Sequence, residues 1–146
     1  GRAMILIELK ARGIEQKVAQ AIREAGMQDC VMLQSFDAES VRIMRELLPE
    51  TPAGVLYRDA WILDPVGRGR RIVKQAREVG ASLAGMNVGA ISAELVKALK
   101  NGGIGVFAWT ADDDWIFEHL IKADVDGIIT NYPERLVRFL GAPVDK

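Results

Sequence analysis

Short apolar runs alternate with amphipathic stretches along the whole chain. Six runs of four to six residues are bounded by polar residues, glycine or proline, which is typical of buried strands. We predict strands over residues 4–9, 31–34, 53–57, 82–86, 105–108 and 125–129.

The stretches between these runs carry apolar residues at helical spacing. Ile14, Val18 and Ile22 share one face of a predicted helix, and Gly26 follows at the position expected for a helix C-cap. The other helices are predicted from the same spacing and from their end signals: one opened by Asp37, one over 71–79, one over 91–99 that is closed by 101–103, one whose first turn holds 112–114, and one begun by Pro133.

Strict alternation of strand and helix predicts an α/β fold with one parallel sheet and right-handed crossovers. The spacing of roughly 20 to 28 residues per unit matches a (β/α)8 TIM barrel, but such a barrel has eight units and this pattern contains six. The sheet is therefore either open or part of a barrel. With 146 residues the chain is long enough for a core, so we expect residues 1–146 to form a single domain.

Composition bears on the partners and the cellular compartment of the protein, but it does not identify a function. Apolar residues make up 49% and charged residues 27% of the chain, and the net charge of -1 does not indicate a nucleic-acid partner. No apolar run reaches the roughly 18 residues that cross a bilayer, so we expect no membrane span. The single cysteine, Cys30, excludes an internal disulfide, and from the residues before the first strand we expect no signal peptide. We expect a cytoplasmic protein, and we expect Gly1 to be either a cloning remnant or a cut end.

The first predicted strand ends in an acid and a base. Glu8 and Lys10 are two residues apart, so they lie on the same side of a strand. Charged groups beside an apolar run are costly unless they leave the core, and in parallel α/β sheets ligands bind at the carboxyl ends of the strands. The pair is therefore either the beginning of a site or an ion pair at a strand end.

Two further regions are candidate functional regions on the sequence pattern alone. Residues 58–69 are too long for a plain strand–helix turn and are predicted to form a functional loop. A cluster of basic residues follows the start of this loop: Arg68, Arg70, Arg71, Lys74 and Arg77. The cluster indicates either a site for a phosphate or acidic partner or the solvated face of an outer helix, and we favour the second interpretation. The lone histidine, His119, is expected to be structural, because its helix would pack outside a barrel.

Four short motifs follow one another in a fixed order. They are Ile7-Glu8-Leu9-Lys10, Gln34-Ser35-Phe36, Val106-Phe107-Ala108-Trp109-Thr110 and Val125-Asp126-Gly127-Ile128-Ile129-Thr130-Asn131-Tyr132-Pro133. Together they resemble the second part of the glycerophosphodiester phosphodiesterases, TIM barrels that use a divalent cation to hydrolyse glycerophosphodiesters to an alcohol and glycerol 3-phosphate. The resemblance implies a partial TIM barrel made of the C-terminal six strand–helix units. It also implies that the first two units, with the catalytic histidines, are absent from this chain.

The resemblance assigns roles to five residues. It implies that Glu8 is a ligand of Mg²⁺ or Ca²⁺ and that Lys10 lies near the substrate phosphate. It places Ser35 and Phe36 at the pocket mouth, where a helix-entry turn with a core aromatic residue is the alternative. It makes Trp109 a wall for the glycerol moiety, with a plain core role as the alternative. No residue of this chain is implied to be catalytic.

The start of the last predicted helix is a further candidate. Thr130 and Asn131 precede it, and barrels often bind phosphate there through backbone amides. We expect no catalytic role for Asn131.

Two functions remain open from the sequence. The first is metal-dependent hydrolysis of a small-molecule phosphodiester by the complete barrel. The second is a non-catalytic barrel remnant that binds a phosphorylated ligand or a partner, or self-associates. In both cases a cut barrel exposes two strand edges and an apolar interior, so we expect self-association or a complementing N-terminal fragment.

Overall fold

Six strands alternate with six α-helices in the computed structural model, which describes residues 3–59 and 61–141. The strands are β1 (Ile5–Glu8), β2 (Val31–Ser35), β3 (Ala53–Tyr57), β4 (Leu83–Asn87), β5 (Gly105–Trp109) and β6 (Gly127–Ile128). The α-helices are α1 (Glu15–Glu24), α2 (Ala38–Leu47), α3 (Pro65–Glu78), α4 (Ala93–Asn101), α5 (Asp114–Lys122) and α6 (Pro133–Phe139). Two short 3-10 turns, η1 (Gln28–Cys30) and η2 (Val88–Ala90), complete the path.

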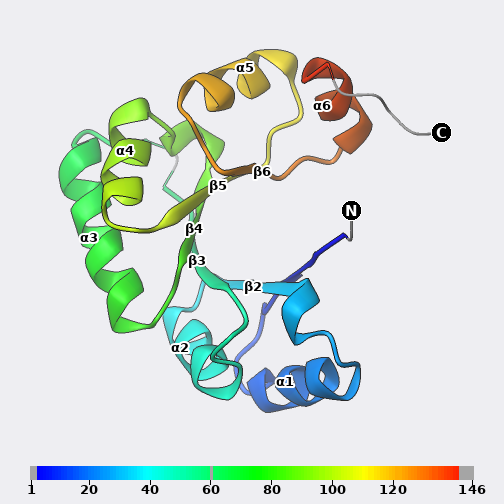
Figure 1. Cartoon of the computed structure of the whole chain (residues 1–146). Helices are drawn as coiled ribbons and strands as arrows, with labels where there is room; N and C mark the ends of the chain where they lie inside the picture. Colours follow the sequence, from blue (N-terminus) through cyan, green and yellow to red (C-terminus); the bar gives the residue numbers. More distant parts are fainter. Residues whose placement is uncertain (1–2, 60, 142–146) are drawn as a thin grey trace.

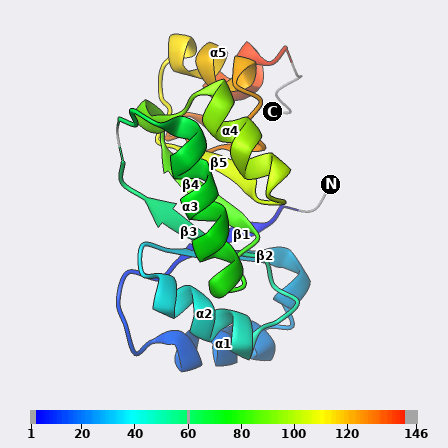
Figure 2. The same cartoon turned by 90° about the vertical axis from the view of Figure 1, so that its left-hand side faces the viewer.

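All strands are parallel, and each pairs only with its neighbours in the chain, in the order β1-β2-β3-β4-β5-β6. The sheet curls, and the helices cover its outer side, while β1 and β6 form its two edges (Figure 1). The view from the side shows α3 and α4 packed next to each other on that outer layer (Figure 2). The predicted partial TIM barrel of six parallel strand–helix units is thus confirmed.

The core lies between the sheet and the helices and is most complete in the middle of the sheet. Every residue of β3 is buried, and so are the large side chains of Ile72 on α3 and Phe117 on α5. The edges are less covered: Ile5 in β1 is 47% exposed, and both residues of β6 are only half-buried. An edge strand has a strand neighbour on one side only, which leaves backbone groups free on the other.

The structure corrects the predicted start of α3. The helix begins at Pro65, not at residue 71, so the irregular segment ends at Asp64. The carboxylate of Asp64 accepts a hydrogen bond from the backbone N–H of Gly67 (2.9 Å), and proline suits the first helical position. The two glycines at 67 and 69 were mistaken for loop residues. Gly69 instead packs its backbone against Ala98 of α4, where no larger residue fits.

The acidic triplet before α5 is also placed differently from the prediction. The helix begins at Asp114, Asp113 occupies the N-cap position, and Asp112 lies outside the first turn. The positive φ angles that end helices are as expected: Gly26 (64°) follows α1 and Gly103 (79°) follows α4. Asp124 also has a left-handed backbone (φ 64°), and its carboxylate Oδ2 lies 2.8 Å from Lys100 Nζ. None of the helices in the described part of the chain combines the length and apolar character that a membrane crossing requires.

Candidate functional site

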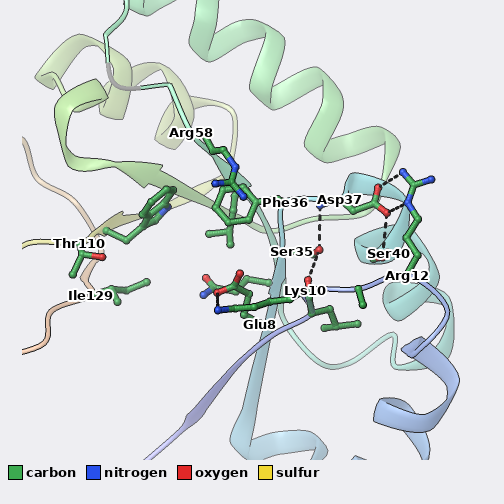
Figure 3. A pocket seen from close by; sticks show the side chains of 15 residues that line it. Glu8, Lys10, Arg12, Ser35, Phe36, Asp37, Ser40, Arg58, Thr110 and Ile129 are labelled. Carbon is green, nitrogen blue, oxygen red and sulfur yellow. Dashed lines mark hydrogen bonds and ion pairs between the residues drawn. The ribbon is translucent and has the colours of Figure 1, made fainter.

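A pocket of about 750 Å³ opens at the carboxyl ends of the strands, inside the curl of the sheet. It draws residues from the ends of β1, β2, β3 and β5 and from the turns that follow them (Figure 3). Glu8, Lys10, Ser35, Phe36 and Trp109 all line it. The structure therefore brings together the five residues to which the family resemblance gave site roles, and their roles stay predictions.

Glu8 and Lys10 enter the pocket because the residue between them is buried. Leu9 is 4% exposed, and its backbone N–H donates to the carbonyl of Gln34 (2.8 Å), which fixes the end of β1 against β2. The charged neighbours then point away from the core. Lys10 Nζ lies 4.0 Å from Glu8 Oε2, and the Lys10 side chain is 79% exposed. An exposed pair at this distance contributes little, so both groups are available to a ligand.

Ser35 is held by the backbone on two sides. It is 2% exposed, and its hydroxyl donates to the carbonyl of Leu9 (2.8 Å) and accepts from the N–H of Asp37 (3.1 Å). These bonds connect the end of β1 to the turn between β2 and α2. The hydroxyl is thus engaged in positioning the strand end that carries Glu8 and Lys10.

Phe36 and Trp109 form an aromatic wall with a residue that the sequence analysis missed. Their rings meet edge to face, with centroids 5.5 Å apart and planes at 88°. The guanidinium Cζ of Arg58 lies 3.9 Å from the Phe36 ring centroid. Arg58 follows β3 directly and lines the pocket. Its position at a strand end, like that of Lys10, was the sequence signal that could have identified it.

The indole N–H of Trp109 is buried and finds no hydrogen-bond partner within residues 3–59 and 61–141. The side chain closes β5, and the peptide bond that follows it is cis. An unpaired buried donor costs about 1–3 kcal/mol, so an acceptor that reached this group would be bound favourably. The indole packs beside Gly85, whose missing side chain leaves the room that Trp109 and Leu56 occupy.

A polar network supports the rim of the pocket at the start of α2. Asp37 caps this helix by accepting from the N–H of Glu39, and it binds the guanidinium of Arg12. The hydroxyl of the buried Ser40 donates to Glu15 Oε1 (2.6 Å). This hydrogen bond holds the pKa of Glu15 below its ordinary value, and the bond from Arg12 does the same for the pKa of Asp37. Both carboxylates are therefore charged at neutral pH.

Asp112 engages the turn before α6, including the backbone amide of Asn131. Asp112 accepts hydrogen bonds from the Asn131 backbone N–H (2.9 Å), the Asn131 side-chain amide (2.8 Å) and the Thr130 hydroxyl (3.1 Å). The bond from the Asn131 backbone is the main reason that the pKa of Asp112 is lowered. The Asn131 amide, one of the groups considered for phosphate binding, is thus bonded to a carboxylate of the chain.

Side chains on the outer layer are accounted for by local contacts. His119 Nε2 lies 3.0 Å from the carbonyl of Ile91, which matches a structural role. Arg68 binds Asp59 and lies over the ring of Tyr57. Three basic residues of α3, Arg70, Lys74 and Arg77, border a second hollow of about 580 Å³, which we call the α3–α4 groove. Its other lining residues are Val66, Val73, Glu78, Ala98, Asn101 and Gly102.

The donor set of the pocket does not make a complete metal site. No group of three His, Cys, Asp or Glu side chains able to hold an ion occurs in the described part of the chain. The pocket is lined by two carboxylates, and Asp37 is already bound by Arg12, so Glu8 is the one lining carboxylate without an arginine partner. A single carboxylate does not hold a divalent cation by itself.

Comparison with known proteins identifies the lineage. Residues 3–135 match the model of the glycerophosphoryl diester phosphodiesterase family. The chain belongs to this family. A glycerophosphodiester phosphodiesterase from Caldanaerobacter subterraneus subsp. tengcongensis is 32% identical over 142 residues, which cover 94% of this chain and 55% of that protein. The chain thus spans about half the length of this relative.

Solved structures agree on the fold. A glycerophosphodiester phosphodiesterase from Parabacteroides distasonis superposes with a TM-score of 0.75 at 20% identity, covering 94% of this chain and 57% of that one. An Oleispira antarctica phosphodiesterase in complex with the product sn-glycerol 3-phosphate superposes with a TM-score of 0.76 at 16% identity, covering 95% and 56%. At these identities the likeness establishes a shared fold.

Proposed function

We propose that this chain supplies one wall of the active-site pocket of a glycerophosphodiester phosphodiesterase. The complete barrel would hydrolyse a glycerophosphodiester to an alcohol and glycerol 3-phosphate. The observation that carries the proposal is the convergence of Glu8, Lys10, Phe36 and Trp109 on one pocket at the carboxyl ends of the strands, in a chain whose family is known. The carboxyl ends are where barrels of this kind place their chemistry.

Within that wall the residues have separate tasks. Glu8 is proposed as one ligand of the family's divalent cation, Mg²⁺ or Ca²⁺, and Lys10 as a contact of the substrate phosphate. Phe36 and Trp109 are proposed to enclose the glycerol moiety. Ser35 is proposed to act on the substrate only through the strand end that it fixes, because its hydroxyl is bonded to Leu9 and Asp37.

Acid–base chemistry is not assigned to this chain. Its one histidine, His119, contacts a backbone carbonyl on the outer layer, away from the pocket. Proton transfer by histidine would thus need residues from elsewhere in a complete barrel.

The test joins this chain to the first two strand–helix units of the Caldanaerobacter relative and measures release of glycerol 3-phosphate. Glycerophosphocholine and glycerophosphoserine serve as substrates, with Mg²⁺ and Ca²⁺ supplied separately. We expect no release by the isolated chain and clear release by the fusion, abolished by Glu8→Ala. The isolated chain should still bind sn-glycerol 3-phosphate weakly. Release by the isolated chain, or a fusion indifferent to Glu8→Ala, would refute the assignment.

Self-association, or completion by an N-terminal fragment, is proposed as a second property of this chain. Its support is the unpaired outer side of β1 and β6 in the described sheet, together with Met4 and Ile5, which are 50% and 47% exposed. We also propose that residues 1–146 unfold as a single domain. Sedimentation at micromolar concentration should show dimers or larger species, and a sharply melting monomer would contradict this proposal.

A further inference from the structure

Arg58 differs from the other basic residues of the pocket in how its charge is balanced. Lys10 faces Glu8, and Arg12 is bound to Asp37. In the described part of the chain Arg58 forms no ion pair, and its contact is the ring of Phe36. Figure 3 shows Arg58 across the pocket from Glu8 and Lys10. The pocket therefore has a free cation at the end opposite the proposed phosphate contact.

The contact with Phe36 leaves the donors of Arg58 available. A guanidinium carries its five N–H groups in its own plane, so contact between its central carbon and a ring leaves the donors at the perimeter. Such a planar set matches the two oxygens of a carboxylate or phosphate. The edge-to-face contact of Phe36 with Trp109 holds the ring, and through the ring the arginine, in place.

The same contact disfavours a cationic ligand. Quaternary ammonium groups are bound over aromatic faces. Arg58 already covers the face of Phe36, and its positive charge repels a second cation at that place. The ring face of Phe36 that Arg58 covers is thus not open to a quaternary ammonium group.

We propose that Arg58 is a specificity-determining residue that binds an oxyanion on the alcohol portion of the substrate. The pocket then prefers glycerophosphodiesters whose alcohol bears a carboxylate or phosphate over those whose alcohol is choline. This inference rests on the proposed function, in which Lys10 contacts the phosphodiester group. A volume of about 750 Å³ accommodates both ends of such a ligand.

The experiment measures binding to the purified chain by calorimetry with three probes: sn-glycerol 3-phosphate, glycerophosphoserine and glycerophosphocholine. Glycerophosphoserine should bind about tenfold more tightly than glycerophosphocholine, as one charge-assisted hydrogen-bonded pair would give. Arg58→Gln should bring the two diesters to about the same affinity and leave sn-glycerol 3-phosphate unchanged. Arg71→Gln is the matched control, since Arg71 is exposed on α3 and lines neither hollow; it should keep the wild-type preference.

Each of the other outcomes would overturn the proposed preference. An equal loss for all three probes in Arg58→Gln would assign Arg58 to the phosphodiester group and overturn the proposed preference. A wild-type chain that binds sn-glycerol 3-phosphate but does not distinguish the diesters would overturn it too, while the proposed function would stand. A chain that binds none of the probes would reject the proposed pocket, and this inference with it.

Discussion

Basic side chains border both the pocket inside the curled sheet and the α3–α4 groove on its outer layer, but they are arranged by different means. In the groove, Arg70, Lys74 and Arg77 all belong to one helix and follow its surface at helical spacing. In the pocket, Lys10 and Arg58 come from segments nearly fifty residues apart and meet only because parallel strands end at the same edge. The groove is a consequence of local periodicity, whereas the pocket is a consequence of topology.

The two hollows also differ in what holds their side chains. The pocket rim is built from buried hydrogen bonds, such as those of Ser35 and Ser40, and from an aromatic contact under Arg58. In the groove Lys74 is 80% exposed, and its Nζ lies 4.0 Å from Glu78. Preorganised groups lose less freedom when a ligand binds, so the pocket is the better candidate for recognition.

The largest expected effect is on the pocket rim, from Ser40→Ala. It removes the hydrogen bond to the buried carboxylate of Glu15 and should lower the free energy of unfolding at neutral pH by about 2 kcal/mol. Because the pKa of Glu15 lies below its ordinary value of 4.5, its stabilisation is present above that pH and is lost as the pH falls through the folded-state pKa. Urea unfolding from pH 7 to 3 should therefore show a shallower acid loss in the variant.

Ser82→Ala is the matched control for that measurement, since Ser82 is exposed and lies away from the pocket. It should leave both the stability and its pH dependence as they are in the wild type. An acid loss in Ser40→Ala as steep as in the wild type would show that the Glu15 contact does not support the rim.

Ser35→Ala should cost about 1 to 2 kcal/mol of unfolding free energy, because it leaves the Leu9 carbonyl and the Asp37 N–H without their partner. It should also weaken binding of sn-glycerol 3-phosphate, since the end of β1 is released. Ser92→Ala, which removes the cap of α4 outside the pocket, should cost about 1 kcal/mol and leave binding unchanged. Equal binding by both variants would sink the positioning role of Ser35.

Phe36→Leu should destabilise the chain by about 1 kcal/mol, because it removes the edge-to-face contact with Trp109 and the contact with Arg58. Phe139→Leu removes a comparable edge-to-face contact with Phe117 on the outer layer. The two variants should melt at similar temperatures, yet Phe36→Leu alone should reduce the preference for glycerophosphoserine. A preference unaffected by Phe36→Leu would mean that Arg58 needs no ring beneath it.

The smallest effect is expected in the groove. Lys74→Ala removes an exposed pair with Glu78 and should change the free energy of unfolding by less than about 0.5 kcal/mol. It should leave the binding of all three phosphate probes unchanged. A clear loss of affinity in this variant would show that the groove, and not the pocket, binds the anion, and would reverse the comparison.

Much of the fold was readable from local pattern. Alternating apolar runs and helical spacing predicted six strand–helix units, because burial on both sides of a parallel strand requires continuous apolar runs. The errors in the predicted helix starts were local as well. For example, α3 begins at Pro65 because Asp64 and Pro65 form a helix start, whereas the nearby glycines favoured the prediction of a loop. The family motifs nominated Glu8, Lys10, Ser35, Phe36 and Trp109, and all five border the pocket.

The sequence by itself therefore determined the order of the elements and the strand ends at which chemistry was to be sought. Only the tertiary structure decided which contacts the residues at those ends make. Arg58 lies over the ring of Phe36, the Ser35 hydroxyl is hydrogen-bonded to backbone groups, and the Asn131 amide donates to Asp112. The contacts Arg58–Phe36, Ser35–Leu9 and Asn131–Asp112 join residues 19 or more positions apart. Spacing along the chain reports which face a side chain shares, but a partner on another strand is fixed only when the sheet curls and brings the strand ends together.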